Sequence, residues 1–330
     1  MRLARAGKQA VPLWLVIVLT ITGIGAGLSV YFFWGMSVPR LHALVALYPT
    51  AVSGHDPADS TDHFLADLDL VKSLGFEGVR LHQADYERYG YGMVADDLNN
   101  RGLKFVMVLH SWDDSQFPDG AYVDHLISYF TNITEQLRSK SNLLWYALDY
   151  PYDWNMNKNS SQLEDPSYHV QLQRMIDAVH ETDPNHKIYL ISGMIEDAPA
   201  SPPTDFDHVD GFGIMPYSKD GTVGEVNTSR IQSWLDGFKD TGKPVYIAEW
   251  GVQTIQGSPN RTYSYGLATN ETMKVKMIQQ FINYIHPKNI YWDYFGLYDF
   301  PNERSDWGIA YDNGTLKPSG ETIQQLLIPS

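Results

Sequence analysis

The stretch from Ser60 to Leu81, STDHFLADLDLVKSLGFEGVRL, contains one complete helix and one strand and shows the pattern on which the chain is built. Ser60 is suited to cap a helix, and the apolar residues from Phe64 to Leu74 recur at the spacing of one helix face. Gly75 ends that pattern, because glycine readily adopts the left-handed conformation found at helix ends. The short apolar run from Gly78 to Leu81 then predicts a strand.

The same alternation of strand and helix continues along the chain. Apolar residues between Leu172 and Val179 and between Met277 and Ile285 indicate further amphipathic helices. The predicted strands are Leu41–Leu47, Gly78–Leu81, Lys104–His110, Leu143–Leu148, Lys187–Ser192, Val209–Met215, Pro244–Glu249 and Ile290–Leu297. Eight strands with crossover helices over about 290 residues favour a single closed (β/α)8 TIM barrel, with an open doubly wound sheet as the alternative.

Residues 11–36 are predicted to form a transmembrane signal anchor. The run from Val11 to Trp34 contains no charged residue, and at ~1.5 Å per residue it is long enough to cross ~30 Å of hydrocarbon. The basic tail, residues 1–10, is expected to stay in the cytoplasm, which places the barrel domain, residues 37–330, outside. A cleaved signal peptide, giving a secreted protein, is the alternative. The length of the run and the lack of a small-x-small cleavage site favour the retained anchor.

The composition agrees with export and restricts the partners. Sequons for N-glycosylation begin at Asn132, Asn159, Asn227, Asn260, Asn270 and Asn313, mostly where loops or helix starts are expected. Cysteine is absent, so the fold has no disulfide framework. The chain has 39 acidic and 24 basic residues, a net charge of −15. Nucleic acid is therefore a poor partner, whereas a neutral carbohydrate is not repelled.

Motifs for nucleotides and for catalytic metals are missing. No Gly-x-Gly-x-x-Gly follows a predicted strand, and the chain has neither a Walker A loop nor His-Glu-x-x-His. The 11 histidines show no ligand spacing. Asp67-Leu68-Asp69 matches the metal-binding Asp-x-Asp pattern, but two solvated carboxylates on a helix are the ordinary interpretation. We therefore expect no metal ion and no organic cofactor.

The active site of a TIM barrel is assembled where its strands end, at their carboxyl termini. Several predicted strands of this chain end in polar or aromatic residues suited to a site. These ends are Val79-Arg80-Leu81-His82, Val108-Leu109-His110-Ser111-Trp112, Ile214-Met215-Pro216-Tyr217 and Ile247-Ala248-Glu249-Trp250-Gly251.

From about Leu41 to Leu327 the sequence resembles the clan A glycoside hydrolases, especially families 5 and 17. The motifs that carry the resemblance are Gly75–Leu81, Val108–His110, Pro244–Gly251, Tyr294–Asp299, Trp307–Ile309 and Leu316–Ser319. The resemblance implies a retaining hydrolase that acts on a β-linked polysaccharide or glycan without a cofactor.

By this resemblance Glu249, at the end of the seventh strand, is the nucleophile that attacks the anomeric carbon. Arg80 and Tyr217 match positions that flank the nucleophile, and a guanidinium helps to keep a carboxylate ionised. His110 matches a position that lines the site. The alternative for Glu249 is a buried glutamate that pairs with Arg80 for stability alone.

The fourth strand departs from the family pattern. The family has Asn-Glu-Pro where this chain has Asp149-Tyr150-Pro151. We predict Asp149 as the acid/base, provided that the strand end bulges by one residue; Asp153 and a site without a normal acid are the alternatives. Carboxyl groups ~5 to 5.5 Å apart indicate retention and ~6.5 to 9.5 Å inversion. The sequence alone leaves this choice open.

Aromatic residues at the strand ends are suited to stack on sugar rings. Those predicted to contact substrate are Trp112, Tyr150, Trp250 and Trp292, with core packing as an equal alternative for Trp292. Trp145, inside the fourth strand, is predicted to be core. Two functions other than hydrolysis remain open: an inactive barrel that binds glycans as a receptor or assembly factor, and a transglycosylase that uses the same site.

Overall fold

The computed structural model describes residues 16–18, 31–33, 41–48, 57, 60–110, 116–149, 166–192, 205–216, 223–255, 267–299 and 305–328. The chain divides into two units, Met1–Arg40 and Leu41–Ser330. In the first unit, β1 (Val16–Val18) and β2 (Tyr31–Phe33) pair as antiparallel strands.

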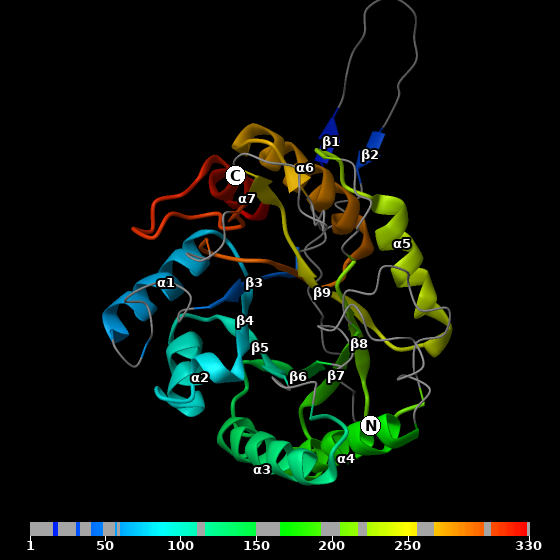
Figure 1. The fold of residues 1–330 in the computed structure, drawn as a ribbon. Helices are drawn as coiled ribbons and strands as arrows, with labels where there is room; N and C mark the ends of the chain where they lie inside the picture. Colours follow the sequence, from blue (N-terminus) through cyan, green and yellow to red (C-terminus); the bar gives the residue numbers. More distant parts are fainter. Residues whose placement is uncertain are drawn as a thin grey trace, which may run out of the picture. The chain divides into compact units, whose positions relative to one another are not determined.

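The second unit contains a closed barrel of eight parallel strands (Figure 1). The strands are β3 (Ala43–Leu47), β4 (Gly78–His82), β5 (Lys104–Leu109), β6 (Leu143–Asp149), β7 (Lys187–Ser192), β8 (Gly211–Ile214), β9 (Val245–Trp250) and β12 (Trp292–Tyr294). The last of them, β12, pairs with both β3 and β9 and so closes the barrel. The predicted (β/α)8 barrel is confirmed, and every predicted strand is found.

Helices surround the barrel as an outer ring (Figure 1). They are α1 (Thr61–Ser73), α2 (Tyr91–Asn100), α3 (Gly120–Leu137), α4 (Pro166–Thr182), α5 (Thr228–Gly237), α6 (Glu271–Ile285) and α7 (Pro318–Leu327). The predicted ends of α1 are confirmed, since Ser60 Oγ accepts from the His63 N–H at 3.5 Å and Gly75 has φ +86°. A small sheet of β11 (Leu267–Ala268), β10 (Gln253–Ile255) and β13 (Ser305–Asp306) lies outside the barrel order.

Alternate residues of each strand pack on the two sides of the barrel wall. One buried cluster fills the barrel interior and includes Leu44, Val106 and Tyr246. The other cluster lies between the barrel wall and the helices. It contains the alternate strand residues, which point outward. Trp145 belongs to the interior cluster, 4% exposed and stacked on Tyr189 with ring centroids 4.7 Å apart. Its predicted place in the core is confirmed.

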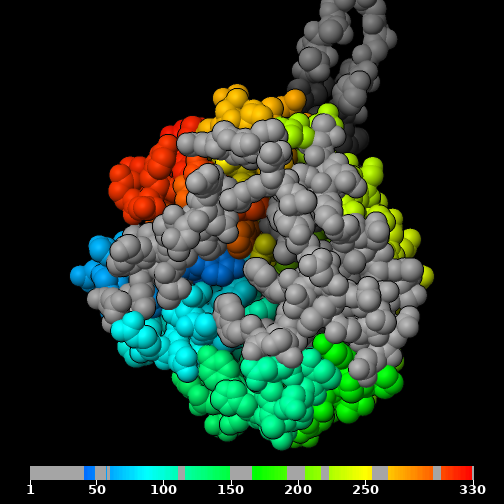
Figure 2. Space-filling view, in the orientation of Figure 1, coloured from blue at the N-terminus to red at the C-terminus, as the bar shows by residue number. Residues whose placement is uncertain are grey.

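The space-filling view shows the same face of the molecule (Figure 2). Near its centre, blue atoms of the segment 41–48 are seen beside orange atoms of the segment around residue 292, in agreement with the pairing of β3 and β12. The first and last strands of the barrel thus meet there.

Most of the predicted membrane anchor lies outside the described residues. Its described parts, β1 and β2, are strands where the sequence predicts a helix, because apolar β-branched and aromatic runs fit either structure. Within the described ranges, no helix combines the length and the apolar character that a membrane crossing requires. The anchor and the outward topology stay predictions.

Four of the predicted sequons begin at described asparagines, and all four asparagines are exposed. Asn227 and Asn270 are the N-caps of α5 and α6, and Asn313 accepts from the Thr315 N–H within a loop. Asn132 instead lies inside α3, and the prediction that most sequons begin near loops or helix starts holds for the other three described asparagines. Asn159 and Asn260 lie outside the described residues.

Candidate active site

Polar side chains from several strands meet inside the barrel. They are Tyr48 directly after β3, Arg80 and His82 of β4, His110 directly after β5, Glu249 of β9 and Asp293 of β12. Arg80 and His82 share a face because residues two apart on a strand point to the same side. Arg80 contacts Tyr48, Glu249 and Asp293, and these contacts join four strand segments into one connected group.

A β-bulge in β9 turns Glu249 toward this group. Ile247 pairs with Trp292 and Trp250 pairs with Tyr294, so three residue steps on β9 face two on β12. Ala248 belongs to the barrel-interior cluster, and regular alternation would therefore send Glu249 outward. The extra residue lets Glu249 face the interior as well, where it contacts Arg80.

Arg80 links two carboxylates. Its Nη2 donates to Glu249 Oε2 at 2.7 Å, and its Nε is in direct contact with Asp293 Oδ2. The side chains of Arg80 and Asp293 are 1% and 0% exposed, whereas that of Glu249 is 14% exposed. A buried guanidinium needs such partners, and its charge in turn favours ionised carboxylates.

Tyr48 and His82 also contact the guanidinium of Arg80. Arg80 Nη2 donates to the Tyr48 hydroxyl at 3.1 Å, and Arg80 Nη1 lies 3.3 Å from His82 Nε2. Burial lowers the pKa of His82 well below its usual value, and the Arg80 charge lowers it further. The neutral imidazole therefore accepts at Nε2, including from the Tyr48 hydroxyl at 2.9 Å. Burial raises the pKa of Tyr48 well above its usual value, which keeps that hydroxyl protonated.

Asp293 is the most enclosed carboxylate of the group. Burial raises the pKa of Asp293 to about 7; the Arg80 charge opposes this rise and the Glu249 charge adds to it. The protonation of Asp293 is therefore coupled to the charge that Glu249 carries.

His110 lies at the same end of the barrel. It is 6% exposed, and its ring centroid is 6.4 Å from that of His82. Its backbone N–H donates to Gln83 Oε1 at 3.1 Å, and Gln83 Nε2 donates to its carbonyl at 2.8 Å. The buried Gln83 amide thus fixes the backbone at the end of β5.

Trp250, which was predicted to contact substrate, packs on the helix side of the barrel wall, and Trp292 takes the core position that the sequence left open as an equal alternative. Trp250 is 5% exposed and stacks on Phe281 of α6, with ring centroids 3.7 Å apart. Trp292 is fully buried and meets the same ring edge-on at 5.4 Å. The bulge at Glu249 explains the burial of Trp250, because it returns Trp250 to the helix side of the wall. The burial of Trp292 follows from alternation, which points Asp293 inward and Trp292 outward.

The predicted acid/base is described by its backbone only. Asp149 ends β6 and pairs with Ile191 of β7. Its side chain lies outside the described residues, as do Trp112, Tyr150, Asp153 and Tyr217.

Asp67 and Asp69 point to different surroundings. Asp67 is 2% exposed and accepts from the Tyr298 hydroxyl at 2.5 Å. Asp69 is exposed and accepts from Arg101 Nε at 2.8 Å. The Asp-x-Asp pattern therefore does not form a joint metal site. Solvated carboxylates were the expectation for both, which is wrong for Asp67.

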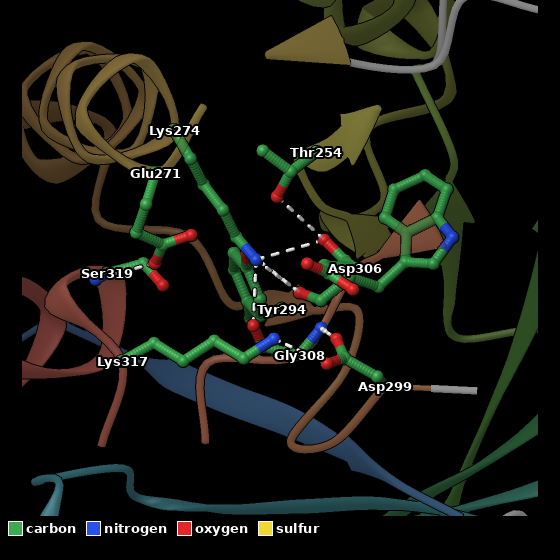
Figure 3. A network of polar contacts seen from close by, with 10 residues as sticks. Thr254, Glu271, Lys274, Tyr294, Asp299, Asp306, Gly308, Lys317 and Ser319 are labelled. Carbon is green, nitrogen blue, oxygen red and sulfur yellow. Dashed lines mark hydrogen bonds and ion pairs between the residues drawn. The ribbon is translucent and has the colours of Figure 1, made fainter. Parts of the chain in front are cut away.

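A buried lysine that sequence reasoning missed holds the loop after β12 (Figure 3). Lys274 of α6 is fully buried, and its Nζ donates to the carbonyls of Asp306, Trp307 and Gly308 at 3.1, 3.0 and 2.7 Å. Trp307 belongs to the barrel-interior cluster, and a Cβ added to Gly251 would lie 3.2 Å from its ring. The ammonium thus fixes an aromatic residue beside the segment that follows Glu249. The available signal was a lysine on the apolar face of a predicted helix.

No family model matches the chain, and no curated protein matches its sequence. Solved structures share its fold. An exo-β-1,4-mannosidase from Opitutaceae bacterium strain TAV5 aligns with TM-score 0.65 and 16% identity, over 87% of this chain and 59% of that one. The GH5_18 protein from Streptomyces cattleya, in complex with GlcNAc, aligns with TM-score 0.62 and 16% identity, over 88% and 80%. A β-D-glucuronidase from Dictyoglomus thermophilum gives TM-score 0.56 and 14% identity, over 80% and 46%, so this chain spans about half its length.

Proposed function

We propose that the chain is a retaining glycoside hydrolase that acts on a β-linked polysaccharide or glycan. The observation that carries this proposal is Glu249, a partly exposed carboxylate that a bulge turns into the barrel and that Arg80 holds at 2.7 Å. A glutamate kept only for stability would not need this exposure. The named substrates of the structural neighbours, a β-1,4-linked mannoside among them, support a β-linked substrate.

In the proposed reaction an oxygen of the Glu249 carboxylate attacks the anomeric carbon as the glycosidic C–O bond breaks. The leaving oxygen takes a proton from the general acid. Water then attacks the anomeric carbon, the ester bond breaks, and the proton of that water returns to the acid/base. Arg80 keeps Glu249 ionised, and Tyr48 with the neutral His82 fixes the guanidinium.

Asp149 is the general acid that we propose. Its backbone continues β6 beyond Ala147 and pairs with Ile191, and both of these neighbours belong to the barrel-interior cluster. The two-residue period of a strand therefore supports an interior position for Asp149, on the side of the barrel wall that Ala147 occupies. We also propose that the barrel is membrane-anchored and faces outward; the charge-free run of residues 11–34 and the sequons support this topology.

A glycan-binding barrel without hydrolysis is the second candidate. It is favoured by Tyr150, which stands where the resembled families have their acid/base glutamate. A transglycosylase would use the same residues with a sugar as the acceptor.

Hydrolysis of a panel of p-nitrophenyl β-glycosides, including the mannoside, xyloside and glucuronide, tests the proposal. Glu249→Gln should lower turnover by several orders of magnitude, because a neutral isostere cannot form the covalent intermediate. Glu77→Gln is the matched control, since Glu77 is also buried but precedes β4 and pairs with Lys104. It should lose stability and keep its turnover. A wild-type protein that binds glycans but hydrolyses none of the panel would favour the receptor.

A further inference from the structure

Arg80 is shared between carboxylates of two different strands. It donates to Glu249 Oε2 of β9 at 2.7 Å and contacts Asp293 Oδ2 of β12. Of these two carboxylates, only that of Glu249 is accessible, because Asp293 is fully buried. Asp293 therefore acts on the site through Arg80 and does not meet a ligand itself.

The proposed reaction changes the charge of this group. Before it, one guanidinium faces two carboxylates. When Glu249 forms a bond to the anomeric carbon and the glycosidic bond breaks, the carboxylate becomes a neutral ester. Arg80 then loses the charge of one partner while it stays 1% exposed, and a buried charge without a counter-ion is costly.

We propose that Asp293 is a positioning residue that neutralises Arg80 while Glu249 is esterified, so that the buried guanidinium keeps a counter-ion throughout the covalent intermediate. The inference rests on the proposed function and assigns a role to a residue outside the reacting pair. Asp293 is thus the counter-ion of Arg80 during the stage in which Glu249 carries no charge.

The surroundings of Asp293 support this role as the counter-ion of Arg80. Among the described residues, the charged groups that act on the pKa of Asp293 are Arg80 and Glu249, and a hydrogen bond with the Ala46 backbone lowers it further. Asp293 in turn helps to raise the pKa of Tyr48. Tyr48 stays protonated because burial raises its pKa, and His82, beyond Arg80, stays neutral because burial lowers its pKa. The Glu249 charge helps to raise the pKa of Asp293 to about 7. When Glu249 becomes an ester, that charge is lost and the pKa of Asp293 falls. Asp293 is therefore ionised while Arg80 lacks its other counter-ion.

Asp293→Asn tests the inference by removing the charge and keeping the shape. Asp293, with a pKa of about 7, is already neutral at the acid limb where Glu249 titrates, so the acid limb of kcat/KM should stay in place in this variant. The ester would lack a counter-ion for Arg80. Labelling by an activated 2-deoxy-2-fluoro glycoside should therefore be about tenfold slower than in the wild type. This deficit in labelling rate should grow as the pH rises to about 7, because only in the wild type does Asp293 ionise when Glu249 is esterified. Asp293→Ser, with a smaller neutral side chain, should show the same deficit and replaces Asp293→Asn if that variant does not fold.

Asp67→Asn is the matched control, because Asp67 is a buried carboxylate that bonds Tyr298 of the outer cluster. It should lower stability and leave the labelling rate unchanged. A labelling rate at pH 7 equal to that of the wild type in a folded Asp293→Asn or Asp293→Ser variant overturns the inference alone. A wild-type protein that hydrolyses nothing in the panel overturns the proposed function, and the inference falls with it.

Discussion

Replacing Arg80 by methionine keeps a side chain of similar length and removes the cation that joins the site. The wild-type guanidinium is 1% exposed and contacts Glu249, Asp293, Tyr48 and His82. In Arg80→Met the two carboxylates face each other without a counter-ion. Both pKa values should then rise, because burial and mutual repulsion both oppose ionisation.

The expected cost in stability is large at high pH. Removing one partner of a buried ion pair costs about 3–5 kcal/mol, in line with about 4 kcal/mol for unit charges at 4 Å and an effective dielectric constant of 20. Carboxyl groups with raised pKa values bind protons in the folded state that the unfolded chain has already released. Stability therefore falls as the pH rises, and the deficit against the wild type should be larger at pH 8 than at pH 5.

Urea unfolding at the two pH values measures this deficit, and the acid limb of kcat/KM should move up by 1–3 pH units in the same variant. Arg101→Met is the control, because Arg101 pairs with Asp69, whose side chain is 65% exposed. It should cost less than about 1 kcal/mol at either pH. If Arg80→Met shows the same deficit at pH 5 and pH 8, Arg80 is not the counter-ion of these carboxylates.

Two further variants test the packing around the site. Lys274→Met should lose about 1–3 kcal/mol of unfolding free energy in urea, because the carbonyls of Asp306, Trp307 and Gly308 lose their shared donor; an unchanged midpoint would show that the ammonium does not hold this loop. Trp292→Ala should lose about 3–5 kcal/mol, as expected for a fully buried indole. A higher KM in that variant without a loss of stability would instead restore the predicted contact with substrate.

The barrel was predictable because its signals are local. Most strands are short apolar runs followed by an amphipathic helix, and Ser60 and Gly75 lie at the two ends of α1. The resemblance at Pro244–Gly251 also drew attention to Glu249. Its contact with Arg80 joins residues 169 positions apart, which the order of the strands brings together.

The features of the site that were not predicted from the sequence depend on pairing between strands that are distant in sequence. The bulge at Glu249 arises from the register of β9 against β12, and it decides that Trp250 packs on α6. Asp293 had an available signal: a charged residue between two aromatic residues in a predicted buried strand requires a partner inside the barrel. His82 had one as well, since it shares a strand face with Arg80.

Covalent labelling tests the central claim most directly. The wild-type protein is incubated with an activated 2-deoxy-2-fluoro derivative of the β-glycoside that it hydrolyses fastest, and its peptides are mapped by mass spectrometry. We predict one added glycosyl group per chain, attached to Glu249 and absent from Glu249→Gln. A label on another carboxylate, or hydrolysis of the parent glycoside with no label on any residue, would contradict Glu249 as the nucleophile.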